Sequence, residues 1–80
     1  MTFREKFHNE TDWKKKVIIL EIFHLVMLSR NKKWRVRDTA IKLRISIGLA
    51  SEDLMLASRI VIVQDCKSRQ QALKILRGQK

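Results

Sequence analysis

Residues 34–57, WRVRDTAIKLRISIGLASEDLMLA, decide the fold of this 80-residue chain. The stretch has the pattern of two short helices joined by a tight turn. Apolar residues recur at the i, i+4, i+7 spacing of a buried helical face, first at Val36, Ala40 and Leu43 and again at Ala50, Leu54 and Ala57. Ile45 supplies an apolar side chain in the turn, and Ser46 is a favourable N-cap for the second helix. Helices this short and this closely joined must cross at a steep angle.

That crossing is the geometry of a helix-turn-helix, whose second helix enters the major groove of DNA. Residues 35–57, with Thr39-Ala40, Leu43, Ile45-Ser46 and the run SEDLMLA, resemble the helix-turn-helix of the ParB-type partition proteins. The pattern departs from that family at two positions. Arg44 stands where the family has its turn glycine, and Ala50 stands where a larger valine or isoleucine packs. Because a left-handed residue other than glycine costs on the order of 1 kcal/mol, Arg44 either tolerates strain or the turn is built differently.

The composition predicts one small all-α domain spanning residues 1–80, with four to five helices. There is no proline, only two glycines and much leucine, isoleucine, lysine and arginine. The single cysteine, Cys66, rules out an internal disulfide framework, and no Cys-His spacing suits a metal. We therefore expect neither a metal nor another cofactor. Because so short a chain builds only a small core, dimerisation is the expected source of further burial.

The charge balance predicts a polyanionic partner. The net charge is +10 and the isoelectric point is near 10.5. Nucleic acid is the first expectation for so basic a domain, with an anionic membrane or an acidic protein as alternatives. The start of the chain, MTFREKFHNE, has no apolar leader, and the apolar run 17–28 is too short to span a bilayer. We expect a cytoplasmic, DNA-associated protein.

Other segments predict helices around the motif. Thr11 and Asp12 can start a long helix over 13–29, which is apolar on more than one face and should be both the centre of the fold and a homodimer contact. Residues 59–64 (RIVIVQ) suit either a short extended segment or a continuation of the preceding helix. Ser68 matches a capping box for a last helix through Arg77.

Smaller expectations concern individual side chains. Ala72, Ile75 and Leu76 should dock the last helix on the long one. Phe3 and Phe7 suit one face of a short helical arm, although a frayed terminus fits equally well. We expect Trp34 to cover the motif as a lid, and we interpret His8 as surface and His24 as a packed histidine.

The motif assigns DNA contacts to two sets of residues. The residues expected to face base edges are Ser46, Ile47, Gly48, Ser51, Glu52 and Met55. The residues expected to contact phosphates are Lys33, Arg35, Arg37, Lys42 and Arg44. The second helix carries two acidic residues, Glu52 and Asp53, and no lysine or arginine. The preceding helix and the turn must therefore supply the positive charge. Asp53 should point into the domain, towards Arg37 or Arg59.

These observations predict a sequence-specific double-stranded DNA-binding protein, acting as a small dimeric transcriptional regulator or a partition or accessory factor. The alternative is a basic helical adaptor that binds an acidic protein. Non-specific RNA or single-strand binding is less favoured because aromatic residues are few. We expect no enzyme and no small-molecule ligand, because the sequence has no nucleophile motif, phosphate loop or paired carboxylates beside a histidine.

Overall fold

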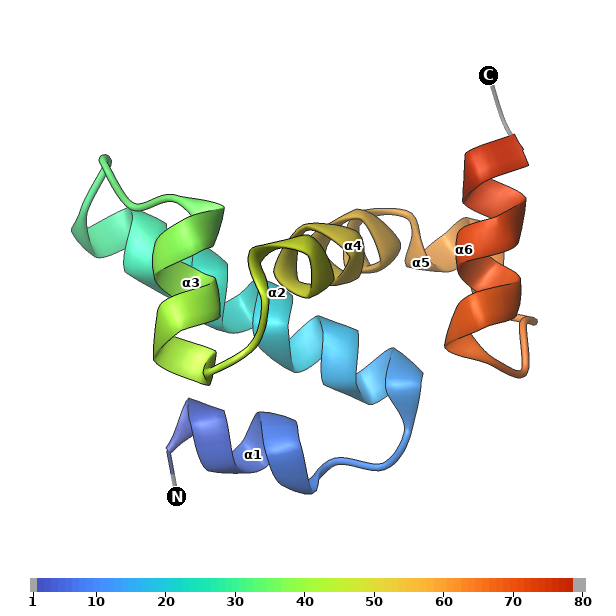
Figure 1. The fold of residues 1–80 in the computed structure, drawn as a ribbon, viewed down its shortest axis with the longest axis horizontal. Coiled ribbons are helices and arrows are strands. Elements are labelled where there is room, and N and C mark those ends of the chain that lie inside the picture. Colours follow the sequence, from blue (N-terminus) through green and yellow to red (C-terminus); the bar gives the residue numbers. More distant parts are fainter. Residues whose placement is uncertain (1, 79–80) are drawn as a thin grey trace.

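The computed structural model describes residues 2–78, and this part of the chain is all-α, as the sequence predicted. It contains six helices, one more than the upper limit of the prediction (Figure 1). They are α1 (Phe3–Asn9), α2 (Trp13–Arg30), α3 (Val36–Leu43), α4 (Ile47–Ser58), α5 (Ile60–Val63) and α6 (Arg69–Gly78).

The extra helix comes from the segment that the sequence left open. Arg59 leaves the helical region, with φ −120° and ψ 25°, and therefore separates α5 from α4. The extended alternative for residues 59–64 is wrong, because this segment has no strand beside it in the described structure and closes a single helical turn instead. Residues 60–63 are all apolar and would therefore be expected to be buried, but only Val63 of α5 is buried.

Helix α2 is the centre of the fold, and α1, α3 and α4 all contact it. It begins where predicted, because the Asp12 carboxylate accepts the backbone N–H of Lys14 at 2.9 Å as an N-cap. It ends at Arg30, one residue beyond the predicted end, and Asn31 is its C-cap. Its buried side chains are Val17, Leu20 and His24. The face that carries them is turned towards the three contacting helices.

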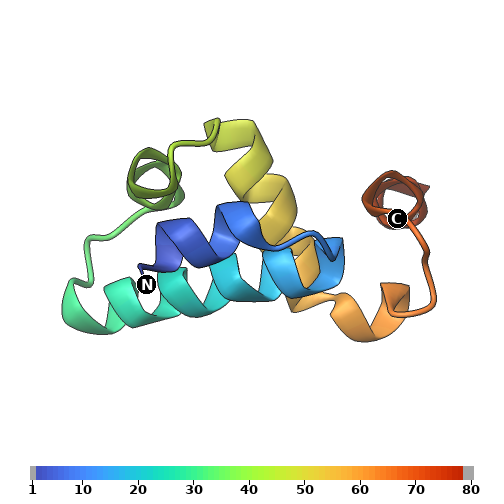
Figure 2. The same cartoon turned by 90° about the horizontal axis from the view of Figure 1, so that it is seen from below.

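Two apolar clusters divide the molecule. The first, here called the motif cluster, joins α1, α2, α3 and α4 and is made of Phe7, Leu20, Ala40, Leu43 and Ala50, with Ile19, Phe23, Val36, Ile45 and Leu54 packed against it. The second, the C-terminal cluster, joins one end of α2 and of α4 to α5 and α6. It is made of Val17, Leu56, Ala57, Val63, Cys66, Ala72, Leu73 and Leu76, with Trp13, Met55 and Ile60 packed against it. Figure 2 shows α6 standing apart from the compact group of α1 to α4.

Helix α1 is folded onto the motif, so a frayed N-terminal arm is the wrong alternative. Its N-cap is a capping box in which the Thr2 hydroxyl accepts the backbone N–H of Glu5 at 3.1 Å. Phe7 is fully buried in the motif cluster. His8, interpreted as plain surface, donates from Nε2 to the Leu43 carbonyl at 2.6 Å, so it ties α1 to the end of α3.

Helix α6 docks differently from the prediction. Its N-terminus is capped as expected, with the Ser68 hydroxyl accepting the backbone N–H of Gln71 at 3.1 Å. It packs on α4 rather than along α2, and its buried face is formed by Ala72, Leu73 and Leu76. Ile75 is not part of this buried face and is 40% exposed. No helix within residues 2–78 has the length and apolar character needed to cross a membrane.

Candidate nucleic-acid interface

The turn between α3 and α4 is the feature that places α4. Arg44 adopts the left-handed conformation, with φ 57° and ψ 49°. Of the two alternatives that the sequence allowed, the structure therefore shows the one in which Arg44 tolerates backbone strain. The backbone N–H of Ile45 bonds to the carbonyl of Ala40 at 3.0 Å, and that of Arg44 bonds to Ile41 at 3.2 Å. This pair of bonds is a Schellman motif, which usually uses glycine at the left-handed position. The bonds satisfy carbonyls at the end of α3 and turn the chain sharply into α4.

A buried polar relay lies behind α3. The Trp34 indole N–H donates to the Thr39 hydroxyl at 2.7 Å, and that hydroxyl lies 2.7 Å from Nδ1 of His24. Because Thr39 accepts from Trp34, its own hydrogen is free to be donated to a neutral imidazole. Burial lowers the pKa of His24, which also favours the neutral ring. Trp34 covers this relay and meets the Phe23 ring edge-on, in keeping with the lid predicted for it.

The N-terminal tip of α4 projects from the body of the molecule. The Ser46 hydroxyl accepts the backbone N–H of Leu49 at 3.1 Å, which makes it the predicted N-cap. The four predicted base-reading residues at this tip, Ser46, Ile47, Gly48 and Ser51, are all exposed. A Cβ added at Gly48 would meet nothing within 4 Å. Packing inside the protein therefore does not require a glycine at this position.

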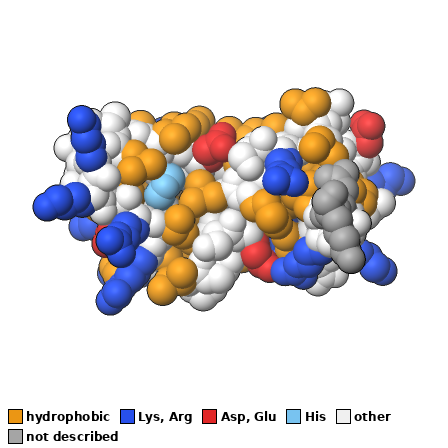
Figure 3. All heavy atoms as spheres, turned by 90° about the horizontal axis from the view of Figure 1, so that it is seen from above, with side chains coloured by type: hydrophobic (Ala, Val, Ile, Leu, Met, Phe, Trp, Pro, Cys, Tyr) orange, Lys and Arg blue, Asp and Glu red, His pale blue; other side chains and the backbone are white. Residues whose placement is uncertain are grey.

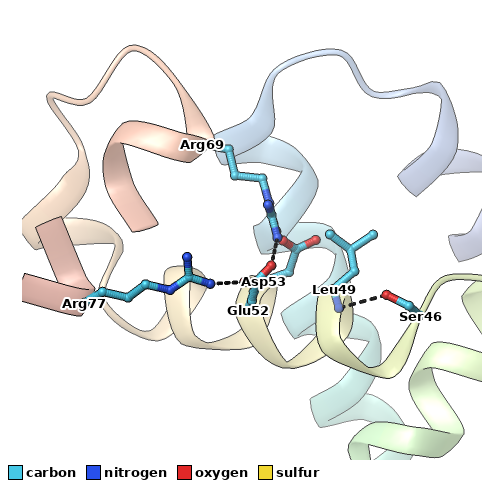
Figure 4. Close-up of polar contacts among 6 residues, drawn as sticks. All are labelled: Ser46, Leu49, Glu52, Asp53, Arg69 and Arg77. Carbon is cyan, nitrogen blue, oxygen red and sulfur yellow. Dashed lines mark hydrogen bonds and ion pairs between the residues drawn. The ribbon is translucent and has the colours of Figure 1, made fainter. Parts of the chain in front are cut away.

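The other two predicted base-reading residues are held by the C-terminal half. Glu52 pairs with Arg69, at 3.0 Å, and with Arg77, both from α6 (Figure 4). The hydrogen bond from Arg69 lowers the pKa of Glu52, and the charges of both arginines act in the same direction. Met55 is half-buried against the C-terminal cluster. Glu52 and Met55 are therefore engaged in contacts within the protein, whereas the four tip residues are exposed.

Asp53 is buried, but not with the partner that the sequence suggested. Its carboxylate pairs with Nε of Arg69 at 2.8 Å, and the prediction of Arg37 or Arg59 is wrong. Burial raises the pKa of Asp53, and the hydrogen bond and charge of Arg69 only partly oppose that effect. Although burial disfavours the charge on Arg69, its bonds to the two acids raise its pKa. Arg69 therefore joins both acids of α4 to α6.

The predicted phosphate contacts lie together at one end of the molecule. All five side chains are exposed, on the loop before α3, on α3 itself and on the turn; they are Lys33, Arg35, Arg37, Lys42 and Arg44. Among the ion pairs in residues 2–78, none involves these five cations. Figure 3 shows Lys and Arg side chains gathered at the end that carries this loop and α3, and again at the α6 end. Positive charge therefore lies at both ends of the molecule.

Sequence reasoning missed the second source of that charge. Arg69 and Arg77 neutralise the acids of α4, and Arg77 remains largely exposed beside Glu52. The only sequence signal was the spacing of Arg69, which lies three, four and seven positions before the apolar residues Ala72, Leu73 and Leu76 and therefore on their side of the helix. That signal could not identify the partners of Arg69, because it does not say which helix α6 packs against.

Within residues 2–78 no group of three or more His, Cys, Asp or Glu side chains is arranged to hold a metal ion. No family model, no curated protein and no solved structure matches this chain. Its function must therefore be inferred from its own residues.

Proposed function

We propose that this chain binds double-stranded DNA, with the tip of α4 in the major groove and the cations of α3 and its flanking segments on the phosphates. The observation that carries the proposal is the left-handed Arg44 turn, which sets an exposed helix tip across α3. A helix of this size fits the major groove, and the basic end supplies the charge that phosphate contacts need.

Within this proposal, base edges are read by the exposed tip. The Ser46 and Ser51 hydroxyls can donate or accept, and Ile47 offers an apolar contact for a thymine methyl group. Gly48 lets the backbone approach the duplex. Glu52 and Met55 are left out of the reading set, because α6 and its cluster engage them. Such a protein would act by occupying its site, as a transcriptional regulator or as a partition or accessory factor.

The proposal is tested by the salt dependence of duplex binding. Selection from random duplexes would first supply a site, and anisotropy titrations would then give the slope of log K against log salt. Replacing Arg35, Arg37 and Lys42 by glutamine should reduce the magnitude of this slope by about 3 and weaken binding to all duplexes alike. The matched control replaces Arg59, Lys67 and Lys74, which are exposed outside the basic end and remove the same charge.

The outcome has a clear reading. Equal losses in the two triple variants would mean that net charge alone draws the chain to DNA, which would overturn the proposed interface. Equal affinity for the selected and a scrambled duplex at physiological salt would remove sequence specificity.

A second candidate, the basic adaptor for an acidic protein, has its own support. Ile41 and Ile47 are 61% and 52% exposed beside the cations, as a surface that accepts an acidic amphipathic helix would be. The adaptor predicts no binding to any duplex, even at low salt.

A further inference from the structure

The side of α2 turned away from the other helices is apolar and uncovered. Ile18, Ile22 and Leu25 are spaced i, i+4, i+7, and Leu25 is 56% exposed. These three residues are called the outer face of α2. On α5, Val61 and Ile62 are exposed as well, at 74% and 54%. Figure 2 shows α2 and α5 along the same lower edge of the molecule, whereas α3 and the beginning of α4 lie at the upper edge.

The molecule exposes more surface than a compact protein of its mass. The molecule exposes 5764 Å², about 700 Å² more than the ~5,050 Å² expected for a compact protein of 9.5 kDa. In a standard interface each partner covers about 800 Å². This excess is close to that area, and the outer face of α2 is one of the surfaces that contribute to it.

The outer face is complementary to itself. Ile22 lies next to the middle of α2, which runs from Trp13 to Arg30. A two-fold axis beside Ile22 that reverses the helix brings Ile22 next to its own copy and Ile18 next to Leu25 of the second copy, so the apolar side chains of the outer face meet one another. The charged ends of α2 fall outside this contact, and the two helix dipoles oppose one another, which is favourable.

We propose that a second copy of this chain packs on the outer face of α2, with the two α2 helices antiparallel. The buried side of α2 faces α3 and α4, so the outer face is opposite the helix-turn-helix tip. The two tips of this dimer point in opposite directions. One duplex cannot reach both of them, and the dimer holds two separate duplex segments instead. This last step rests on the proposed DNA binding; the dimer itself does not.

Charge distinguishes this occupant from an acidic protein or an anionic membrane. Two copies each carry +10, so they repel, and only the apolar contact holds them together. Raising the salt concentration screens that repulsion and tightens the dimer. The same salt weakens the binding of any anionic partner. The sign of the salt effect therefore identifies what covers the outer face.

The first experiment is sedimentation equilibrium of the full chain at 50 and 500 mM salt. We expect a dimer that is tighter at the higher salt. Ile22→Glu puts an unpaired charge at the two-fold axis and should raise the dimer dissociation constant by more than about 100-fold. The control is Ile75→Glu on α6, where the isoleucine is exposed to a similar degree, 40% against 46%. Circular dichroism confirms that both variants keep their helices.

Two results would overturn the dimer: a monomer at both salt concentrations, or a dimer that Ile22→Glu and Ile75→Glu weaken equally. Adding anionic vesicles to the original chain covers the membrane occupant, because uptake that Ile22→Glu abolishes, together with a monomer in solution, would replace the second copy by a lipid surface.

The second experiment tests the opposed tips. A duplex fixed to beads captures a second, labelled duplex only when one dimer holds both. The original chain and Ile75→Glu should bridge, whereas Ile22→Glu should bind a single duplex without bridging. A dimer that binds one duplex but never two refutes the opposed arrangement. A dimer that binds no duplex leaves the α2 contact standing and refutes the proposed DNA binding instead.

Discussion

The half of the molecule built around the motif cluster, here called the motif half, and the C-terminal half are held together by different means. The motif half has two sets of short-range bonds, the Schellman turn and the Ser46 cap, and two histidine contacts that tie α1 and α2 to α3. The C-terminal half depends on a cluster rich in small side chains and on Arg69, which bonds to two acids of α4. Local bonds form wherever their helices form, whereas α6 needs one particular docking. We therefore expect α6 to be the part that loosens first.

The largest expected effect breaks the C-terminal half. Arg69→Met leaves Asp53 buried without its partner and should lower the free energy of unfolding by about 2–3 kcal/mol, because an uncompensated buried charge is costly. Arg77→Met, at a side chain that is 64% exposed, should cost less than about 1 kcal/mol. Urea denaturation measures both. Equal losses would show that the buried Asp53 pair does not dominate the docking of α6.

A smaller effect sharpens the motif half. Arg44→Gly relieves the left-handed strain and should raise the free energy of unfolding by about 0.5–1 kcal/mol, after the extra flexibility of glycine in the unfolded chain is counted. Arg44→Ala removes the same charge and keeps the strain, so it should bring no such gain. Both variants should weaken duplex binding alike. Thermal unfolding measures the stability of both variants. If both are more stable than the original chain, the loss of the Arg44 charge, and not the relief of backbone strain, causes the gain.

Gly48→Ala separates stability from recognition. A Cβ at this exposed helical position meets open space, so alanine should stabilise α4 by about 0.5–1 kcal/mol. If the backbone lies close to a duplex, the same methyl group should reduce affinity for the selected site. The free energy of unfolding and the duplex affinity, from anisotropy titration, are measured on the same preparation of this variant. Unchanged or tighter duplex binding would contradict a close approach at Gly48.

The smallest effect is a pH dependence in the motif half. Because the folded-state pKa of His24 is lowered, the folded protein takes up its proton less readily than the unfolded chain. The neutral ring therefore makes its full contribution to the free energy of unfolding above the unfolded-state pKa of about 6.5. This contribution is lost as the pH falls below that value. His24→Leu should flatten the unfolding free energy between pH 7.5 and 5.5. A slope that persists in this variant would assign the effect to other groups.

The accurate sequence predictions share a physical basis. Asp12, Ser46 and Ser68 accept backbone N–H groups a few residues away, so the local pattern was sufficient to place these helix starts. The exposed tip of α4 and the basic residues around α3 followed from helical spacing in the same way. Glu52, by contrast, sits on the expected side of α4 yet is engaged by residues 17 and 25 positions further along the chain.

The sequence by itself determined most of the helices, their caps and the basic residues around α3, because each depends on neighbours within about two helical turns. The left-handed conformation of Arg44 was one of two alternatives that only the structure decided. Tertiary structure decided that α6 packs on α4, that Arg69 reaches Asp53, and which side of α2 stays uncovered. Those features depend on how rigid helices orient relative to one another. Because α2 is apolar on several faces, its sequence pattern allowed any of these faces to be buried. The packing of α1, α3 and α4 against α2 decided that the outer face stays exposed.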